Sequence, residues 1–368
     1  MPAEPVSQTV TKRVDSEVDL IQHYLAPLAA GNPGALSLSD DCAVLACPSG
    51  EELVLTTDAV AEGVHFISGE EPGSIAWKAL AVNVSDLAGK GARPLVYLMA
   101  LSFPEAPDEN WMAGFALGLA AAQERFGIRL AGGDTDRRPG PITVTITAIG
   151  SVPKGKMVRR GTARPGDRLF VSGTLGDAAL GLALRLDSQK TRDWGLTPDE
   201  ARHLSRRYER PEPRIELAAS LRACASAAMD ISDGLAKDLA AMCRASGVAA
   251  RVRGRDVPLS PAARKIVSLE PDRFEDVVAG GEDYEVLAAV APEKCAEFIA
   301  MAQANGIPVT EIGYVETGKG VRFEGLDGTL LALTRLGWDH FSGAAGGASN
   351  RAGAGLHPAP ENITVPGA

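Results

Sequence analysis

The sequence predicts a two-domain protein of the α/β (α+β) class. At 368 residues the chain is long enough for two domains of ordinary size. Strand-like and helix-like segments alternate in both halves, and a basic, glycine-containing connection separates the halves just after Pro153. We therefore expect an N-terminal domain over residues 15–152 and a C-terminal domain over residues 153–341.

The first half shows helices and strands in its pattern of apolar residues. Ser16 and Asp19 resemble a capping box at the start of a helix. Residues 142–152 alternate threonine with apolar side chains, which is typical of a strand with one covered face. The predicted helices cover residues 16–30, 72–88 and 108–126, and the predicted strands cover 39–45, 53–57, 94–102, 128–131 and 142–152. The helix at 108–126 is rich in Ala and Gly, which suits close packing.

The second half repeats this alternation and ends in a compositionally different tail. Strands are predicted at 168–172, 249–252, 284–290 and 308–315, and helices at 178–186, 198–208, 213–225, 235–245, 261–268 and 293–305. Residues 313–319 match the start of a Walker A loop, but Gly320 stands where Ser or Thr would bind Mg²⁺, so we interpret this stretch as a hairpin turn. Residues 342–368 are rich in Gly, Ala, Pro and Asn, and we expect a disordered tail.

Composition excludes several classes of function. A net charge of -10 argues against a general nucleic-acid binder, which usually carries a basic face. The five cysteines are scattered without a C-x-x-C pair, which suits free thiols in a reducing compartment. We find no signal peptide and no apolar run long enough to span a bilayer, so we expect a cytoplasmic protein without membrane or nucleic-acid partners.

Aspartates beside small or hydroxyl residues recur along the chain. Gly132-Gly133-Asp134 follows the predicted strand 128–131, and we expect a sharp turn there that approaches a ligand. Two carboxylates about 4 Å apart repel by roughly 4 kcal/mol at an effective dielectric of about 20, so a cluster requires cations. We interpret the set as one divided site for divalent metal and phosphate; the same pattern occurs at Asp41, Asp58, Asp86, Asp230 and Asp233.

A structural role for each aspartate remains the alternative, because aspartate is common in turns and caps. Ser232 or Asp233, for example, could cap the helix that follows Gly234, a role compatible with ligand binding. The five histidines form no H-x-x-x-H pair, and neither a G-x-S-x-G elbow nor the protein-kinase motifs are present. The chain lacks a convincing base and nucleophile, and phosphoryl transfer to an already ionised acceptor is a reaction that needs mainly positioning and charge neutralisation.

Eight motifs, in their order along residues 16–341, resemble the thiamine-monophosphate kinase family of the aminoimidazole-ribonucleotide-synthetase superfamily. The segment from Thr57-Asp58 to His65 and the closing motif at Trp338 point to the thiamine branch rather than to its sister enzymes. The motifs are Asp40-Asp41-Cys42-Ala43, Thr56-Thr57-Asp58 with Gly63-Val64-His65-Phe66, Asn83-Val84-Ser85-Asp86-Leu87-Ala88, Gly132-Gly133-Asp134-Thr135, Arg164-Pro165-Gly166-Asp167, Asp230-Ile231-Ser232-Asp233-Gly234, Gly280-Gly281-Glu282-Asp283-Tyr284 and Gly337-Trp338-Asp339-His340-Phe341.

The resemblance implies that ATP gives its γ-phosphoryl group to thiamine monophosphate, with several Mg²⁺ ions and no catalytic protein base. It implies ATP contacts by Gly133, Asp134, Arg160 and Ser232, and contacts to the thiamine end by His65, Glu282 and Trp338. It also implies an N-terminal ATP- and Mg²⁺-binding domain whose sheet pairs across a homodimer, and a C-terminal domain that closes over the nucleotide. The implied metal ligands are Asp41, Thr56, Thr57, Asp58, Asp86, Asp134, Asp230 and Asp233.

Two residues depart from the family pattern, and two alternatives stay open. Ser39 replaces the usual glycine before Asp40-Asp41, and Asp136 adds a negative charge after Thr135. One alternative is a sister ATP-dependent enzyme, although the chain has no reactive cysteine before Cys42 or at its C-terminal end. The other is a sensor of thiamine phosphates without turnover, which the intact aspartate set disfavours.

Overall fold

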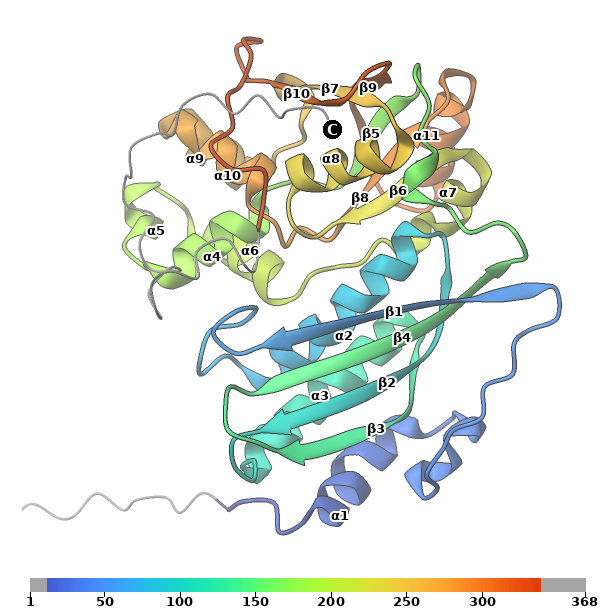
Figure 1. The fold of residues 1–368 in the computed structure, drawn as a ribbon. Coiled ribbons are helices and arrows are strands. Elements are labelled where there is room, and N and C mark those ends of the chain that lie inside the picture. Colours follow the sequence, from blue (N-terminus) through green and yellow to red (C-terminus); the bar gives the residue numbers. More distant parts are fainter. Residues whose placement is uncertain (1–11, 339–368) are drawn as a thin grey trace, which may run out of the picture.

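Residues 12–338 are described by a computed structural model, in which two mixed sheets carry helices on their faces (Figure 1). The first sheet has the strand order β1-β4-β2-β3, with β2 and β3 parallel and the other neighbours antiparallel. Helices α2 (Pro72–Gly89) and α3 (Glu109–Phe126) pack on one face. The strands are β1 (Glu51–Ala61), β2 (Arg93–Phe103), β3 (Arg129–Arg137) and β4 (Thr143–Pro153).

The second sheet has the strand order β10-β7-β9-β5-β8-β6 and lies above the first in Figure 1. Its strands are β5 (Arg168–Ser172), β6 (Ala225–Ile231), β7 (Ala249–Arg253), β8 (Glu285–Val290), β9 (Val309–Glu316) and β10 (Gly320–Glu324). Its helices are α4 (Asp177–Leu186), α5 (Lys190–Asp193), α6 (Pro198–Glu209), α7 (Ala218–Cys224), α8 (Leu235–Ser246), α9 (Pro261–Leu269), α10 (Phe274–Ala279) and α11 (Cys295–Ala304). The two sheets with their helices confirm the predicted mixed α/β class.

Helix α2 connects the two sheets and positions the site. The Glu71 carboxylate accepts hydrogen bonds from Gly73 N and Ser74 N, and Pro72 occupies the first helical turn, so the sequence defines where the helix begins. The helix is buried along almost its whole length, because it contacts β1 and β4 on one side and β6 on the other. An α-helix buried on all sides carries few polar residues, so those it does carry are candidates for function.

Helices α2 and α3 pack closely, which confirms the close packing that we expected from the Ala- and Gly-rich sequence of residues 108–126. Asp108 caps α3 through Asn110 N and Trp111 N, and Gly127 ends the helix with φ 65°. The backbone of Gly118 lies against that of Gly73: a Cβ added at Gly118 would stand 2.3 Å from the Gly73 Cα. Only glycine fits at this crossing.

Three predicted elements of the first half are wrong in part. Residues 39–45 form no strand, and the predicted helix 16–30 is α-helical only in α1 (Glu17–Leu20), after which π and 3-10 turns follow. The predicted turn at Gly132-Gly133 is absent because β3 continues through both glycines. The close approach expected there exists, but to β2: a Cβ on Gly133 would stand 1.9 Å from the Met99 carbonyl oxygen.

Two predictions for the second half also need correction. The helix predicted at 213–225 is a 3-10 turn followed by the short α7, and strand β6 then begins at Ala225, where no strand was predicted. The hairpin predicted at 313–319 is wrong, because β7 lies between β9 and the unpredicted strand β10. The expected tail and the end of the closing motif lie outside the described residues. Among residues 12–338, no helix is both long and apolar enough to cross a membrane.

Candidate functional site

A cavity of about 460 Å³ lies where α2 meets the second sheet, and we call it the site cavity. It is lined from β1, α2, the end of β6, the loop 280–284 and helix α4. The strand end and the loop after it are typical places for ligand-binding groups in α/β proteins. Eight of the predicted site residues line it together: Asp58, His65, Asp86, Asp230, Ser232, Asp233, Glu282 and Trp338.

Strand alternation decides which residues of the Thr-Thr-Asp motif reach the site cavity. Thr56 and Asp58 share the face of β1 that packs on α2: the Thr56 hydroxyl donates to the Asp86 carboxylate, and Asp58 N donates to Asn83 Oδ1 at 3.0 Å. Thr57 points to the opposite face, where it accepts a hydrogen bond from Thr147 Oγ1 at 3.0 Å. In a single chain, Thr57 is therefore separated from the other predicted metal ligands of this motif.

Two buried carboxylates of the site cavity, Asp58 and Asp230, have raised pKa values. Burial, and then the charges of Asp86 and Asp233, raise the pKa of Asp58 to about 6. Burial raises the pKa of Asp230 well above its usual range, and the charge of Asp86 adds to this effect. Such a concentration of unsatisfied negative charge is suited to a divalent cation, which binds carboxylate oxygens. Within residues 12–338, however, no three acidic, histidine or cysteine side chains are already arranged around a metal position.

The loop after β6 is held by a residue that the motif did not reveal. The Asp238 carboxylate accepts hydrogen bonds from Ser232 N at 3.0 Å and Asp233 N at 3.1 Å. Gly234 precedes α8 with φ 115°, a conformation that favours glycine, and no side chain at this position caps the helix. The structure therefore does not show the predicted capping by Ser232 or Asp233. The Asp233 carboxylate instead pairs with Lys237 at 2.8 Å.

His65, Glu282 and Trp338 come from three distant parts of the chain and meet at the site cavity. His65 follows β1, and its Nδ1 accepts a hydrogen bond from Ala61 N at 3.1 Å. Glu282 lies in the loop before β8 with φ 66°, and Trp338 N donates to the Asp233 carbonyl at 3.0 Å. An acidic group and an aromatic face near one cavity suit a cationic ring.

A second cavity, of about 720 Å³, holds the remaining acidic motifs. Asp41, Gly133 and Asp134 line it together with side chains of the open face of the first sheet, including Leu98 and Thr147. This cavity lies on the face of the first sheet away from α2. In a single chain, the predicted metal ligands are therefore divided between two cavities on opposite faces of the sheet. Arg160 lines neither of them; it lies in a 3-10 turn near Lys90, whose pKa its charge helps to lower.

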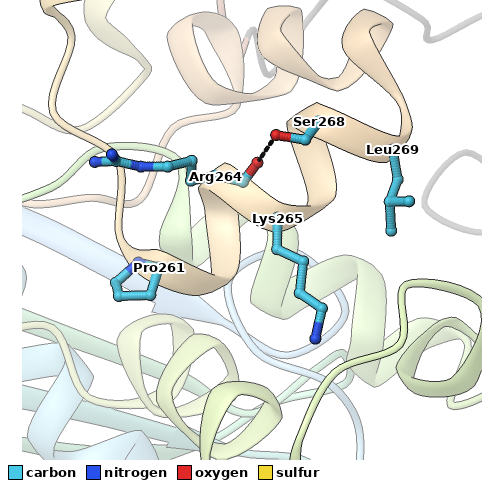
Figure 2. A pocket seen from close by; sticks show the side chains of 5 residues that line it. All are labelled: Pro261, Arg264, Lys265, Ser268 and Leu269. Carbon is cyan, nitrogen blue, oxygen red and sulfur yellow. Dashed lines mark hydrogen bonds between the residues drawn. The ribbon is translucent and has the colours of Figure 1, made fainter.

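A third cavity, drawn in Figure 2, lies on the surface of α9. Pro261, Arg264, Lys265, Ser268 and Leu269 line it, and Ser268 Oγ donates to the Arg264 carbonyl at 2.7 Å. None of the predicted site residues lines this cavity, and none of its five lining residues is acidic.

Two lysines, Lys78 in α2 and Lys90 just after it, belong to none of the eight motifs, and Asn83 belongs to one of them but received no role of its own. Lys78 binds Glu282, Asn83 binds the backbone of Asp58, and Lys90 donates to the Ala228 carbonyl at 2.9 Å beside the charges of Asp230 and Asp86. The sequence carried one usable signal for them: a charged or amide side chain within a helix whose other positions are almost all apolar or small.

Comparisons with known proteins agree on one family. The family model for the AIR synthase related protein, N-terminal domain, matches residues 39–152, and the model for its C-terminal domain matches residues 164–325. The chain is 42% identical over 330 residues to a thiamine-monophosphate kinase from Caulobacter vibrioides, covering 88% of this chain and 91% of the relative. It is 38% identical to the Escherichia coli K12 protein of that name, covering 83% and 92%.

Solved structures of thiamine-monophosphate kinases also match this chain. A thiamine-monophosphate kinase from Stenotrophomonas maltophilia matches with a TM-score of 0.71 at 40% identity, covering 80% of this chain and 91% of that one. AaThiL in complex with AMPPCP and TMP matches with a TM-score of 0.70 at 33% identity, covering 88% and 97%. The Escherichia coli hydrogenase maturation protein HypE shares the fold at 23% identity, with a TM-score of 0.69 and coverage of 87% and 99%.

Proposed function

This chain belongs to the thiamine-monophosphate kinase family of AIR-synthase-related proteins, and on that premise we propose that it transfers the γ-phosphoryl group of ATP to thiamine monophosphate, forming thiamine diphosphate and ADP. The observation that carries the proposal is the meeting of two unlike sets of residues in the site cavity. Carboxylates suited to metal and phosphate, Asp58, Asp86 and Asp230, share that cavity with His65, Glu282 and Trp338, which suit a cationic aromatic substrate.

The carboxylates of the site cavity fit Mg²⁺ by the chemistry of their donors. Asp58, Asp86, Asp230 and Asp233 would hold it on the α2 side of the sheet, and Thr56 orients Asp86 by hydrogen bonding. Mg²⁺ in proteins takes only one or two carboxylates and fills its shell with water and phosphate oxygens, so a preformed cage is not required. When bound, the metal supplies neutralisation of the charge that two anionic reactants bring together.

The residues of the chain then act by binding and orientation. The acceptor is a phosphate oxygen that is already largely ionised at pH 7, because its second pKa is about 6, so no protein group has to remove a proton. Ser232 at the end of β6 would contact ATP, and Gly133, Asp134 and Arg160 would contact it where the two domains or two chains meet. Glu282 and Trp338 would orient the thiamine end against His65.

We further propose a homodimer in which the open faces of two N-terminal sheets meet. Leu55 and Leu98 lie on that face with 62% and 40% of their surfaces exposed. The division of the acidic motifs between opposite faces of the sheet supports the same arrangement, because a partner chain can bring its Asp41 and Asp134 toward this chain's site cavity. The acidic net charge of -10 and the free state of all five cysteines support a cytoplasmic enzyme that does not bind nucleic acid.

The test is formation of thiamine diphosphate from thiamine monophosphate by the full chain with ATP and Mg²⁺, with free thiamine as a parallel acceptor. We expect product from the monophosphate, none from thiamine, and none when EDTA replaces Mg²⁺. Binding of both ligands without product would favour the sensor alternative. Binding of ATP alone would favour a sister enzyme, and a screen of other acceptors would follow.

A further inference from the structure

Lys78 is a buried cation that binds two residues at the substrate end of the site cavity. It lies in the middle of α2, and only 3% of its side chain is exposed. Its Nζ lies 2.7 Å from Glu282 Oε2 and donates to the His65 carbonyl at 2.9 Å. The ammonium also lies over the ring of Tyr208, 3.5 Å from the ring centroid. Removing a charge from water is unfavourable, so a buried lysine requires charged and hydrogen-bonding partners such as these.

Tyr208 completes this arrangement from the second domain. Its hydroxyl donates to the same His65 carbonyl at 3.1 Å, and its ring is buried at the end of α6. Lys78 and Tyr208 thus hold the loop after β1 and the loop 280–284 against each other, and we call this pair with its two acceptors the Lys78 clamp. Both loops contribute a lining residue to the site cavity, namely His65 and Glu282.

The direction of the Glu282 side chain is set by Lys78 rather than by its backbone alone. Glu282 N donates to the Ser232 carbonyl at 2.7 Å and Tyr284 N donates to the Ile231 carbonyl at 2.8 Å, which fix the loop on the end of β6. Glu282 takes a left-handed backbone, φ 66°, which side-chain-bearing residues adopt rarely. The backbone bonds leave the side-chain torsions of Glu282 free, and the ion pair with Lys78 selects one orientation of its carboxylate.

We infer that Lys78 is a positioning residue for the thiamine end of the substrate, which acts by holding Glu282 and the His65 loop in one geometry. This inference rests on the proposed function and goes beyond it by assigning a role to a residue that does not line the cavity itself. The clamp joins parts of both domains, so it also makes the substrate end depend on how the domains sit together. The nucleotide end, built around Asp86, Asp230 and Ser232, is joined to the clamp by the backbone hydrogen bond from Glu282 N to the Ser232 carbonyl. A substitution of the Lys78 side chain removes neither the donor nor the acceptor of that bond.

The experiment compares Lys78→Met and Tyr208→Phe with a matched control, Trp77→Phe. Trp77 neighbours Lys78 on α2 and also ties the helix to the second domain, through a 2.8 Å hydrogen bond from Nε1 to the carbonyl of Pro211, a residue of neither loop. Steady-state kinetics with each substrate varied are combined with calorimetric titration of thiamine monophosphate in the presence of a non-hydrolysable ATP analogue. Melting temperature is recorded for every variant.

We expect Lys78→Met to raise KM and Kd for thiamine monophosphate by about tenfold or more, with KM for ATP changed by less than about twofold. Tyr208→Phe should shift the same constants by about two- to fivefold, and Trp77→Phe should lower the melting temperature without separating the two KM values. In the double variant Lys78→Met/Glu282→Gln, the rise in KM and Kd for thiamine monophosphate should not exceed the rise in Glu282→Gln alone by more than about twofold. The reason is that both substitutions remove the same ion pair.

Equal changes of the two KM values in Lys78→Met and Tyr208→Phe would show that Lys78 is only a structural residue. A selective rise of KM for thiamine monophosphate in the control Trp77→Phe would show the same. Either result would overturn the inference and leave the proposed function intact. If Lys78→Met does not fold, Tyr208→Phe decides the question by the same criterion. If the wild-type chain neither binds nor converts thiamine monophosphate, the proposed function fails and the inference fails with it.

Discussion

Asp58 shows how one side chain can serve activity at the expense of stability. Its pKa of about 6 arises from burial and from the charges of Asp86 and Asp233, so at neutral pH an ionised Asp58 is repelled by its neighbours. We expect Asp58→Asn to lower turnover by about 100-fold or more, because a neutral amide binds Mg²⁺ poorly, while the melting temperature of the metal-free protein stays equal or rises. Activity assays and thermal unfolding in EDTA measure the two effects.

The matched control for this substitution is Asp199→Asn on the surface of α6, where 87% of the side chain is exposed. That variant should keep both activity and melting temperature. Near wild-type turnover in Asp58→Asn would remove Asp58 from the proposed metal site, and a large drop in its melting temperature would show that the carboxylate stabilises the fold.

Asp283 predicts a pH dependence of stability. It is buried, both of its oxygens accept from Gly176 N at 2.9–3.0 Å, and burial raises its pKa to about 8 from 3.8. Between these values the folded chain keeps a proton that the unfolded chain loses, so the stability from this group is full below about pH 4 and is lost as the pH rises through 8.

We therefore expect the free energy of unfolding, measured with urea in the presence of EDTA, to fall as the pH rises from about 5 to about 8.5. Asp283→Asn should make this fall smaller by a few kcal/mol at most, because each unit of pKa shift corresponds to about 1.4 kcal/mol. Asn keeps the acceptor toward Gly176 but does not ionise. A slope identical to that of the wild type would mean that other buried carboxylates, such as Asp238 with its pKa of about 7, account for the dependence.

Sequence motifs revealed eight of the residues that line the site cavity, but not how the sheet distributes the predicted site residues between its two faces. Asp58, Asp86, Asp230 and Asp233 were each recognisable by a hydroxyl or small neighbour, and the structure brings them together. The sequence did not show which face of the sheet each residue occupies. Strand alternation tells which residues share a face, but the helix that covers one face has to be known before that face can be identified. This is why Thr57 and Asp134, predicted in the same set, lie on the opposite face.

At the level of elements, helix α3 offers two glycines that differ only in what faces them. A Cβ on Gly118 would stand 2.3 Å from the backbone of Gly73, whereas one on Gly114 would meet Pro72 at an ordinary 3.5 Å. We expect Gly118→Ala to destabilise the protein by roughly 2 kcal/mol or more, since α2 and α3 must separate. Gly114→Ala should stabilise it by up to about 1 kcal/mol, because alanine favours the helix.

Urea unfolding monitored by circular dichroism measures this difference, and the kinetic constants of Gly114→Ala should match those of the wild type. Similar free energies for both variants would contradict the close helix crossing. Gly118→Ala should in addition raise KM values, since α2 carries Asp86 and Lys78 into the site; a destabilised variant with unchanged kinetics would show that α2 keeps its place when α3 shifts.

The elements that the sequence missed share a physical reason. Strand β6 begins with Ala225, Ser226, Ala227 and Ala228, which lack the branched or aromatic side chains typical of strands, and its burial on both sides removes any alternation. Residues 39–45 end in a short apolar run, Cys42 to Leu45, yet no neighbouring strand pairs with them among the described residues. Gly132 and Gly133 indicated a turn because the need for close contact between β2 and β3 is invisible without the sheet.

At the scale of the whole molecule, the open face of the first sheet exposes two large apolar side chains, Leu55 and Leu98. Leu55 pairs with Ile149 across β1 and β4, and Leu98 pairs with Thr147 across β2 and β4, so these side chains form neighbouring rows on one face. Exposed apolar rows of this kind mark association surfaces. A face-to-face pair of such sheets would cover them in both chains at once, which is the arrangement of a symmetric dimer.

This argument gives a final prediction for Leu98→Asp. Two charges buried at a symmetric interface, one from each chain, would be repelled and desolvated, so we expect the dimer to dissociate into monomers at micromolar concentration in sedimentation velocity. Leu117→Asp on α3, where 73% of the leucine is exposed on the other side of the sheet, is the control and should remain dimeric. Because Asp41 and Asp134 lie away from the site cavity in one chain, the Leu98→Asp monomer should also lose turnover. A fully active monomer would mean that one chain assembles its metal site alone, by moving residues 39–45 rather than by recruiting a partner.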